Sequence, residues 1–267
     1  MVRFSWPVFQ CENVFLARQV QNVDMIQCKD AVPSWEAATP WFLVARAALY
    51  HGVLRGTDKV SFIEVDVGHD RGRPASDDMV KYLPPLAPFI GALWYYRGVH
   101  EEFVEGFAKA VKMLRKGLMQ PSHPKIAIFY GQKYANWTQH HTNYTNEAAL
   151  AGAARVLGEA GLSFTVVSEY NLDDLKDMRA VVLADNPILP REAAAALEEF
   201  VKGGGKLVIE DMERRDLKGK PYTLRLPTTA LKVPAGFFAS VQPRGEGLTM
   251  TAAQQQIAQK VVEYLRQ

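Results

Sequence analysis

Short apolar runs alternate with helix-like segments across residues 125–211, and this alternation is the feature that most restricts the fold. The run KIAIFYG, which begins at Lys125, has the unbroken apolar pattern of a strand buried on both faces. A helix over 146–160, strands in LSFTVVS and AVVLAD, a helix over 191–202 and a strand in GGGKLVIED follow. This order predicts an α/β fold with a parallel sheet covered on both faces. Its buried residues should include Ile126, Ile128, Val166, Val182, Leu183, Leu207 and Ile209.

The rest of the chain gives a weaker pattern. Strands over 24–28 and 59–67 enclose a helix over 39–54, and a second helix is expected over 101–117. Two clear strand–helix units in the first 120 residues are too few for an eight-unit barrel, which needs about 250 residues. The segment QPSHP at 120–124 has the composition of a linker. After 211 we expect short strands over 222–226, 231–233 and 237–241, then a helix over 251–266.

Composition excludes several classes of protein. The chain has 267 residues, 48% hydrophobic and 22% charged, and a formal net charge of +2. This balance gives no electrostatic reason to expect a nucleic acid or a membrane as partner. Cys11 and Cys28 are the only cysteines, which is too few for a disulfide scaffold, and the first residues lack a signal-peptide pattern. We therefore expect a cytoplasmic protein without a cofactor.

The segment from His140 to Asp211 resembles the trimerisation domain of glycoside hydrolase family 42 (GH42) β-galactosidases. The resemblance rests on Asn143-Tyr144, Asn146-Glu147, Ser168-Glu169, the strand end over 181–187 and the glycines at 203–205. It implies a flavodoxin-like, class I amidotransferase-like domain that assembles the protein into a trimer or a multiple of one. In that family the domain follows a catalytic barrel, so residues 1–120 are identified as an incomplete (β/α)-barrel-like portion.

The same resemblance suggests which residues are catalytic. CKDAVPS resembles the strand end that carries the family's nucleophilic glutamate, which places Asp30 at that position. GTDKVSFIEVDV resembles the last barrel strand and places Glu64 at a family glutamine. No segment before Asp24 can hold the family's general acid. Either a partner chain supplies the first half of the barrel, or this chain is no longer an enzyme.

Carboxylates at strand ends also make chemical sense. Retaining glycoside hydrolysis uses two carboxyl groups about 5–5.5 Å apart. Glu64 and Asp66 are two positions apart, so they share one side of their strand. Asp30 lies at the end of the strand that precedes it in the chain. The alternative is that these carboxylates form structural ion pairs with Lys29, Arg71 or Arg73.

Two further groups could contact a substrate. His69 lies just after Glu64 and Asp66, which would suggest a metal site, but no paired-histidine spacing supports one, and we expect no metal. Trp137, His140 and His141 follow the first strand of the predicted sheet, where doubly wound folds bind ligands. They could line a sugar pocket or pack in an interface. The domain has no cysteine nucleophile and no G-x-S-x-G turn, so we interpret it as non-catalytic.

These observations predict three parts: a partial barrel-like portion (1–120), a flavodoxin-like trimerisation domain (121–216), and a C-terminal part of small strands and a helix (217–267). The expected function is that of a glycoside-hydrolase-like protein acting on β-linked sugars, in the manner of a β-galactosidase. The alternative is a non-enzymatic protein for oligomerisation or sugar binding. The aromatic stretch 89–96 is a candidate contact in the homo-oligomer.

Overall fold

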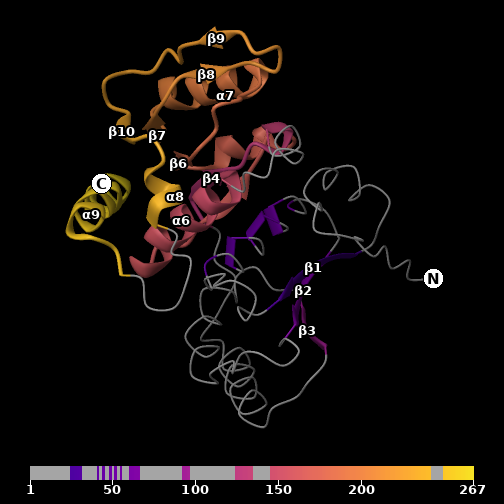
Figure 1. Ribbon diagram of the computed structural model, residues 1–267. Coiled ribbons are helices and arrows are strands. Elements are labelled where there is room, and N and C mark those ends of the chain that lie inside the picture. The colour runs from indigo at the N-terminus through magenta and orange to yellow at the C-terminus, as the bar shows by residue number, and fades with distance from the viewer. Residues whose placement is uncertain are drawn as a thin grey trace.

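The structure is a computed structural model that describes residues 124–134, 145–241 and 249–267, several positions between 41 and 55, and the backbone of 25–31, 60–66 and 92–96. Two parallel sheets organise these residues (Figure 1). The first has the order β1-β2-β3 and the second the order β10-β7-β6-β4-β5. A two-stranded sheet of β8 (Arg214–Arg215) and β9 (Pro221–Tyr222) completes the set.

The second sheet confirms the predicted α/β fold. Its strands are β4 (Ile126–Phe129), β5 (Thr165–Val167), β6 (Ala180–Leu183), β7 (Lys206–Asp211) and β10 (Leu231–Pro234), and every pairing among them is parallel. From the β5 edge inward, the sheet contains the second of these strands in chain order, then the first, the third, the fourth and the fifth. That is the flavodoxin-like order, and it places the topological switch point between β4 and β6.

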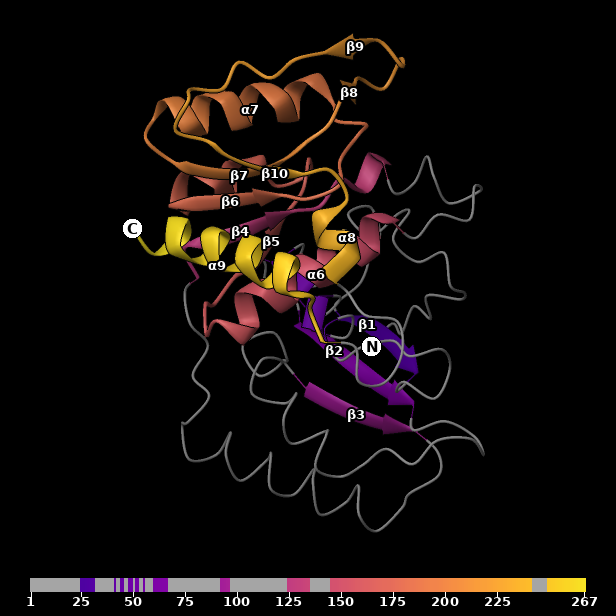
Figure 2. The same cartoon turned by 60° about the vertical axis from the view of Figure 1, so that its left-hand side comes forward.

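Helices cover both faces of this sheet (Figure 2). Successive residues of each strand therefore pack into different cores, one on each face. One core contains Ile126, Ile128 and Val182 together with α6 (Thr145–Glu159), α8 (Phe237–Val241) and α9 (Ala252–Arg266). The other contains Leu183, Leu207 and α7 (Arg191–Lys202), with the 3₁₀ turn η4 (Leu172–Asp177). All seven residues predicted to be buried are buried.

Helical residues between 41 and 52 pack into the core of the second sheet. Val44, Ala45, Ala48 and Leu49 share the core that holds α6 and α8, and their i, i+1, i+4, i+5 spacing forms one helical face. This helix also makes a backbone contact, since a Cβ built on Gly52 would lie 2.2 Å from the carbonyl oxygen of Val166 in β5. A segment from the first part of the chain therefore completes the core of the second.

The first sheet supports the predicted barrel-like portion. The strands β1 (Met25–Ala31), β2 (Val60–Asp66) and β3 (Ala92–Tyr96) are parallel and adjacent in chain order, like neighbouring strands of a (β/α) barrel. The described residues form no closed barrel. The strand β3 was not predicted; it occupies most of the aromatic stretch that we proposed as an oligomer contact.

The C-terminal part corrects two predictions. Residues 222–226 were expected to form a strand, but the strand there covers only Pro221–Tyr222. Residues Phe237–Val241 were expected to form a strand and instead form α8, which follows Gly236 with a φ of +72°. The predicted C-terminal helix is confirmed as α9, and Thr251 and Gln254 cap its start with reciprocal hydrogen bonds. Within the described residues, no helix has the length and apolar character needed to cross a membrane.

Candidate functional site

Polar residues gather where the parallel strands of the second sheet end, at the edge where such sheets bind ligands. One or more of them follows or ends each of β4, β5, β6 and β7. All are buried except Asp185, which is half-buried. We call this set the carboxyl-edge cluster: Gln132, Ser168, Glu169, Asp185, Asn186 and Glu210.

Glu169 holds the turn that follows β4. Its Oε2 accepts a hydrogen bond from the backbone N–H of Gln132 at 2.8 Å. Its Oε1 accepts a hydrogen bond from the backbone N–H of Lys133 at 2.6 Å. Next to it, Ser168 Oγ accepts a hydrogen bond from Gln132 Nε2 at 3.1 Å. The two bonds to the Glu169 carboxylate are charge-assisted, and bonds of that kind are short and strong. They fix the backbone at the point where the chain continues toward Trp137, His140 and His141.

Burial makes the Glu169 carboxyl group a weaker acid than an exposed glutamate. Burial raises its pKa above the ordinary value, although the backbone donors and the nearby Lys133 ammonium act in the opposite direction. Lys133 itself bonds Glu192 on α7, with Nζ 2.6 Å from Oε1, and lies over the Tyr170 ring at 5.8 Å. That hydrogen bond raises the pKa of Lys133 and lowers the pKa of Glu192.

The raised pKa of Glu169 predicts a pH dependence of stability. A carboxyl group with a folded pKa above its unfolded value contributes stability at pH values below the unfolded pKa, near 4.5, and loses it as pH rises through the folded pKa. Glu169→Gln should remove this contribution. The urea midpoint should therefore fall less between pH 5 and pH 8 in the variant than in the wild type. Parallel pH profiles of the two proteins would contradict the assignment, and Glu213→Gln, an exposed position, is the control.

Asn186 and Glu210 continue the same arrangement around β6. Asn186 Oδ1 accepts a hydrogen bond from Gly131 N at 3.0 Å, and its Nδ2 donates to the carbonyl oxygen of Ala184. Glu210 accepts two backbone hydrogen bonds, from Asp185 N at 2.7 Å and from Phe238 N at 2.8 Å. Burial raises the pKa of Glu210 as well. The cluster thus links the ends of β4, β5, β6 and β7 and the start of α8.

Asp185 is a strained residue at this edge. Its φ of +35° is the single positive value of a non-glycine residue in the described part of the chain. Such a conformation persists only where surrounding contacts impose it, and here Glu210 holds the Asp185 N–H. Buried Arg214 lies nearby and donates to the carbonyl oxygen of Glu210 at 2.9 Å; burial lowers the pKa of its guanidinium to about 10.

The carboxyl-edge cluster mainly holds the backbone of the surrounding loops in place. Each of the four carboxylate oxygens of Glu169 and Glu210 accepts a backbone N–H. Within the described residues, no three histidine, cysteine, aspartate or glutamate side chains gather as a metal site would require. The cluster therefore sets the shape of the loops at this edge of the sheet.

The structure places three of the predicted site residues on neighbouring strands. Asp30 is in β1, and Glu64 and Asp66 are in β2. In the pairing of these strands, Asp30 lies opposite Val65, and Glu64 lies opposite Lys29. Paired positions share a face and successive positions alternate, so positions 30 and 64 belong to opposite faces of the sheet, whereas 64 and 66 share one. His69, Trp137, His140 and His141 lie outside the described residues.

Sequence reasoning did not identify the carboxyl-edge cluster as a site. Ser168-Glu169 and the strand end over 181–187 entered only as marks of the family resemblance. The available signal was positional, because polar residues end or follow β4, β5, β6 and β7 of one parallel sheet, and such residues meet at one edge.

Comparisons with known proteins extend the resemblance to the fold. No family model matches the chain, and no curated protein matches its sequence. Among solved structures, it is similar to Gan42B, a GH42 β-galactosidase from G. stearothermophilus, with a TM-score of 0.57 and 16% identity over 80% of this chain and 36% of that one.

Two other glycoside hydrolases are similar in structure. The GH42 exo-carrageenase from Bacteroides ovatus matches with a TM-score of 0.53 and 14% identity over 86% of this chain and 34% of its own. The exo-β-1,4-mannosidase Op5Man5 from Opitutaceae bacterium strain TAV5 matches with a TM-score of 0.50 and 12% identity over 91% and 58%. The chain thus has the fold of the C-terminal part of a GH42-like β-galactosidase, and it spans about a third of the length of the GH42 enzymes it matches.

Proposed function

We propose that the chain is a glycoside-hydrolase-like protein that acts on β-linked sugars, with β-galactosides as the first class to test. The observation that carries the proposal is the pairing of β1, β2 and β3 in barrel-like order, with Asp30, Glu64 and Asp66 near the carboxyl ends of two neighbouring strands. Barrel enzymes build their sites at these ends. The remaining strands would come from another chain or another part of the protein.

The register of β1 and β2 restricts the catalytic assignment. Positions 30 and 64 belong to opposite faces, so they do not serve one site together. Glu64 would act with Asp66, its neighbour on the same face, whereas Asp30 would act with a carboxylate from the missing half of the barrel. His69, Trp137, His140 and His141 are proposed as substrate contacts near the ends of the strands that they follow.

The test is turnover of aryl β-galactosides and aryl β-mannosides by the chain alone and by any complex in which it is isolated. Asp30→Asn and Glu64→Gln are assayed separately, because an amide can neither form a glycosyl–enzyme bond nor exchange a proton usefully. We expect one substitution to remove most of the turnover and the other to leave it. Loss in both variants, or in neither, with unchanged thermal melts would refute the assignment.

A second candidate is a non-enzymatic protein for oligomerisation or sugar binding. It is favoured by the carboxyl-edge cluster, where backbone N–H groups occupy every oxygen of Glu169 and Glu210. Under this proposal the assembly is a trimer or a multiple of one. Calorimetric binding of galactose without hydrolysis of any aryl glycoside would support it, and turnover by the assembled protein would exclude it.

A further inference from the structure

The helical residues between 41 and 52, which we call the connecting helix, lie between β1 and β2 in the chain. Both ends of this helix contact the second sheet or one of its helices. At the start, the Trp41 ring lies against α6, where a Cβ built on Gly158 would be 2.2 Å from the indole. At the end, the backbone of Gly52 touches the carbonyl oxygen of Val166 in β5. The connecting helix is therefore held at both ends by a later part of the chain.

The carbonyl group of Val166 points away from the rest of the sheet. The strand β5 lies at an edge, and Val167 O accepts its hydrogen bond from Tyr130 N, just after β4, at 2.8 Å. Successive carbonyl groups of a strand point to opposite sides, so the carbonyl group of Val166 points to the open edge. Proteins cover such edges with a helix or loop, because unpaired backbone groups there invite pairing with other chains. Here the end of the connecting helix provides the cover.

Asn171 joins the end of the connecting helix to the carboxyl end of β5. Its Nδ2 donates to the carbonyl oxygen of Gly52 at 3.2 Å and to Asp174 Oδ2 at 3.0 Å. Its Oδ1 accepts hydrogen bonds from Ser168 N at 2.8 Å and from Ser168 Oγ at 3.1 Å. The last carbonyl groups of a helix lack partners within the helix. Asn171 therefore caps the connecting helix from a different part of the chain.

Arg55 adds two ion pairs at the same place. Its Nη2 lies 3.2 Å from Asp177 Oδ2, and its Nε lies 3.9 Å from Asp174 Oδ2. Both carboxylates belong to η4, the turn that begins after Asn171. Partly exposed pairs of this kind contribute little alone, but these two act on the turn that also caps the helix. We call this set of residues the junction: Gly52, Arg55, Asn171, Asp174 and Asp177.

The junction is continuous with the carboxyl-edge cluster. Ser168 belongs to the cluster and donates to Asn171, while Gln132 Nε2 donates to Ser168 Oγ at 3.1 Å. A series of hydrogen bonds therefore runs from the turn after β4, through Ser168 and Asn171, to the carbonyl oxygen of Gly52. The network that shapes the edge of the second sheet also holds the helix that leads into β2.

We propose that Asn171 is a positioning residue for the carboxylates of β2, Glu64 and Asp66. The junction fixes the end of the connecting helix that leads into this strand, and the stretch from Arg55 to Val60 spans at most about 18 Å. A displaced helix end therefore moves the strand, and misplacing a reacting group by about 1 Å can cost about a hundredfold in rate. The catalytic part of this inference rests on the proposed function, whereas the placement of β2 does not.

The first test is amide hydrogen exchange of the full chain, which needs no turnover. Asn171→Asp keeps the acceptor for Ser168 but turns an oxygen, in place of the Nδ2 donor, toward the carbonyl of Gly52. We expect β2 to exchange about fivefold faster or more, the effect of losing one buried hydrogen bond, while β6 and β7 keep the wild-type rate. Asp173→Asn, at an exposed position of the same turn, should change none of these rates. Wild-type exchange in β2, or equal acceleration in β2, β6 and β7, would overturn the proposal.

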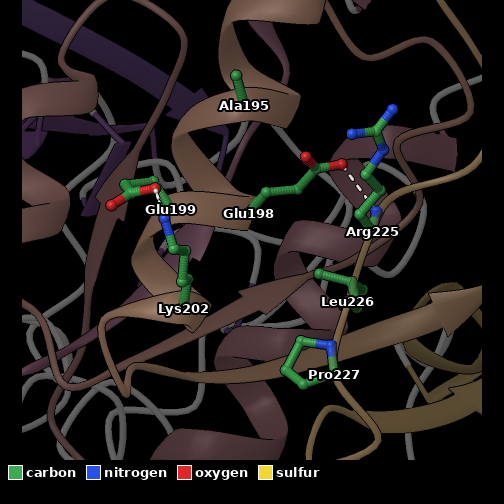
Figure 3. Close-up of a pocket in the computed structure, with 7 residues that line it drawn as sticks. All are labelled: Ala195, Glu198, Glu199, Lys202, Arg225, Leu226 and Pro227. Carbon is green, nitrogen blue, oxygen red and sulfur yellow. Dashed lines mark hydrogen bonds and ion pairs between the residues drawn. The ribbon is translucent and has the colours of Figure 1, made fainter.

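Arg55→Ala tests the junction with a milder change that leaves the hydrogen bonds of Asn171 in place. We expect β2 to exchange about twofold faster, because the ion pairs are partly exposed, and Arg55→Lys should restore the wild-type rate. The matched control is Lys202→Ala. It removes an exposed ion pair, 3.6 Å from Glu199, beside a groove on α7, on the other face of the sheet (Figure 3). Equal exchange of β2 in Arg55→Ala and Lys202→Ala would contradict the junction.

Turnover supplies the readout that is specific to catalysis. With an aryl glycoside that the wild type hydrolyses, Asn171→Asp should lower kcat about tenfold or more and leave KM within about twofold, since a misplaced reacting group affects the transition state. A wild-type kcat, or a change in KM alone, would overturn the positioning role. If the wild type hydrolyses no glycoside, the proposed function fails, and the exchange rate of β2 alone decides whether Asn171 holds that strand.

Discussion

Gly152→Val is expected to lower the free energy of unfolding by about 3 kcal/mol or more, because overpacking costs about 1–3 kcal/mol and more where the obstacle cannot move. The glycine lies in α6 where that helix meets α8. A Cβ built there would lie 1.8 Å from the carbonyl oxygen of Phe238 and 2.7 Å from its carbonyl carbon. Both atoms are backbone, so the two helices would have to separate.

Urea denaturation of Gly152→Val and of a matched glycine variant measures the effect. Gly203→Ala is the control, because Gly203 has a φ of −74° and the nearest atoms to a Cβ there lie at 3.4 and 3.5 Å. We expect this control to change the free energy of unfolding by less than about 1 kcal/mol, within the range of helix propensities. Equal effects of the two substitutions would mean that α6 and α8 do not meet closely.

Glu210→Ala should be the second strongly destabilising change. It leaves the N–H groups of Asp185 and Phe238 without their acceptor, and each unsatisfied buried donor costs about 1–3 kcal/mol, or about 2–6 kcal/mol together. Glu210→Gln keeps the shape but turns an NH₂ group toward one of the two donors. Its expected loss is about half, near 1–3 kcal/mol.

The order of the three proteins in urea midpoint checks this account: wild type, then Glu210→Gln, then Glu210→Ala. Glu213→Ala provides a surface control, since its carboxylate pairs with Arg215 while 62% exposed, and such pairs contribute about 0–1 kcal/mol. If Glu210→Gln were as stable as the wild type, the carboxylate would not be holding both N–H groups.

The sequence was most informative where strands are buried on both faces. Residues such as Ile128 and Val182 lie in unbroken apolar runs, and the helices between them have clear periodicity, so β4 to β7, α6, α7 and α9 could all be predicted. The strand β3 was missed because three prolines precede it, at 84, 85 and 88. Prolines are typical of loops, so the aromatic residues that follow them were not interpreted as a strand. The pattern FFASV suits a strand, yet it forms α8, where Phe237, Phe238 and Val241 are buried together.

The carboxyl-edge cluster could be predicted only in position. Its residues follow strands, which the sequence shows, but the partners of Glu169 are backbone groups about 37 positions away, and those of Glu210 lie 25 and 28 positions away. A backbone N–H has no residue-specific signature, so no pattern announces these bonds. The assignment of Asp30 and Glu64 to opposite faces likewise depends on strand register, which the separate segments do not specify.

The helical residues between 41 and 52 have a consequence for how such a protein can evolve. Val44 and Leu49 are fully or almost fully buried in the core of a sheet that begins some 80 positions later. A gene fusion that transferred only residues 125–267 to a new protein would expose the hydrophobic surface on which this helix packs. Exposed surfaces of this kind promote aggregation. The two parts of the chain are therefore expected to pass between genes together rather than as interchangeable modules.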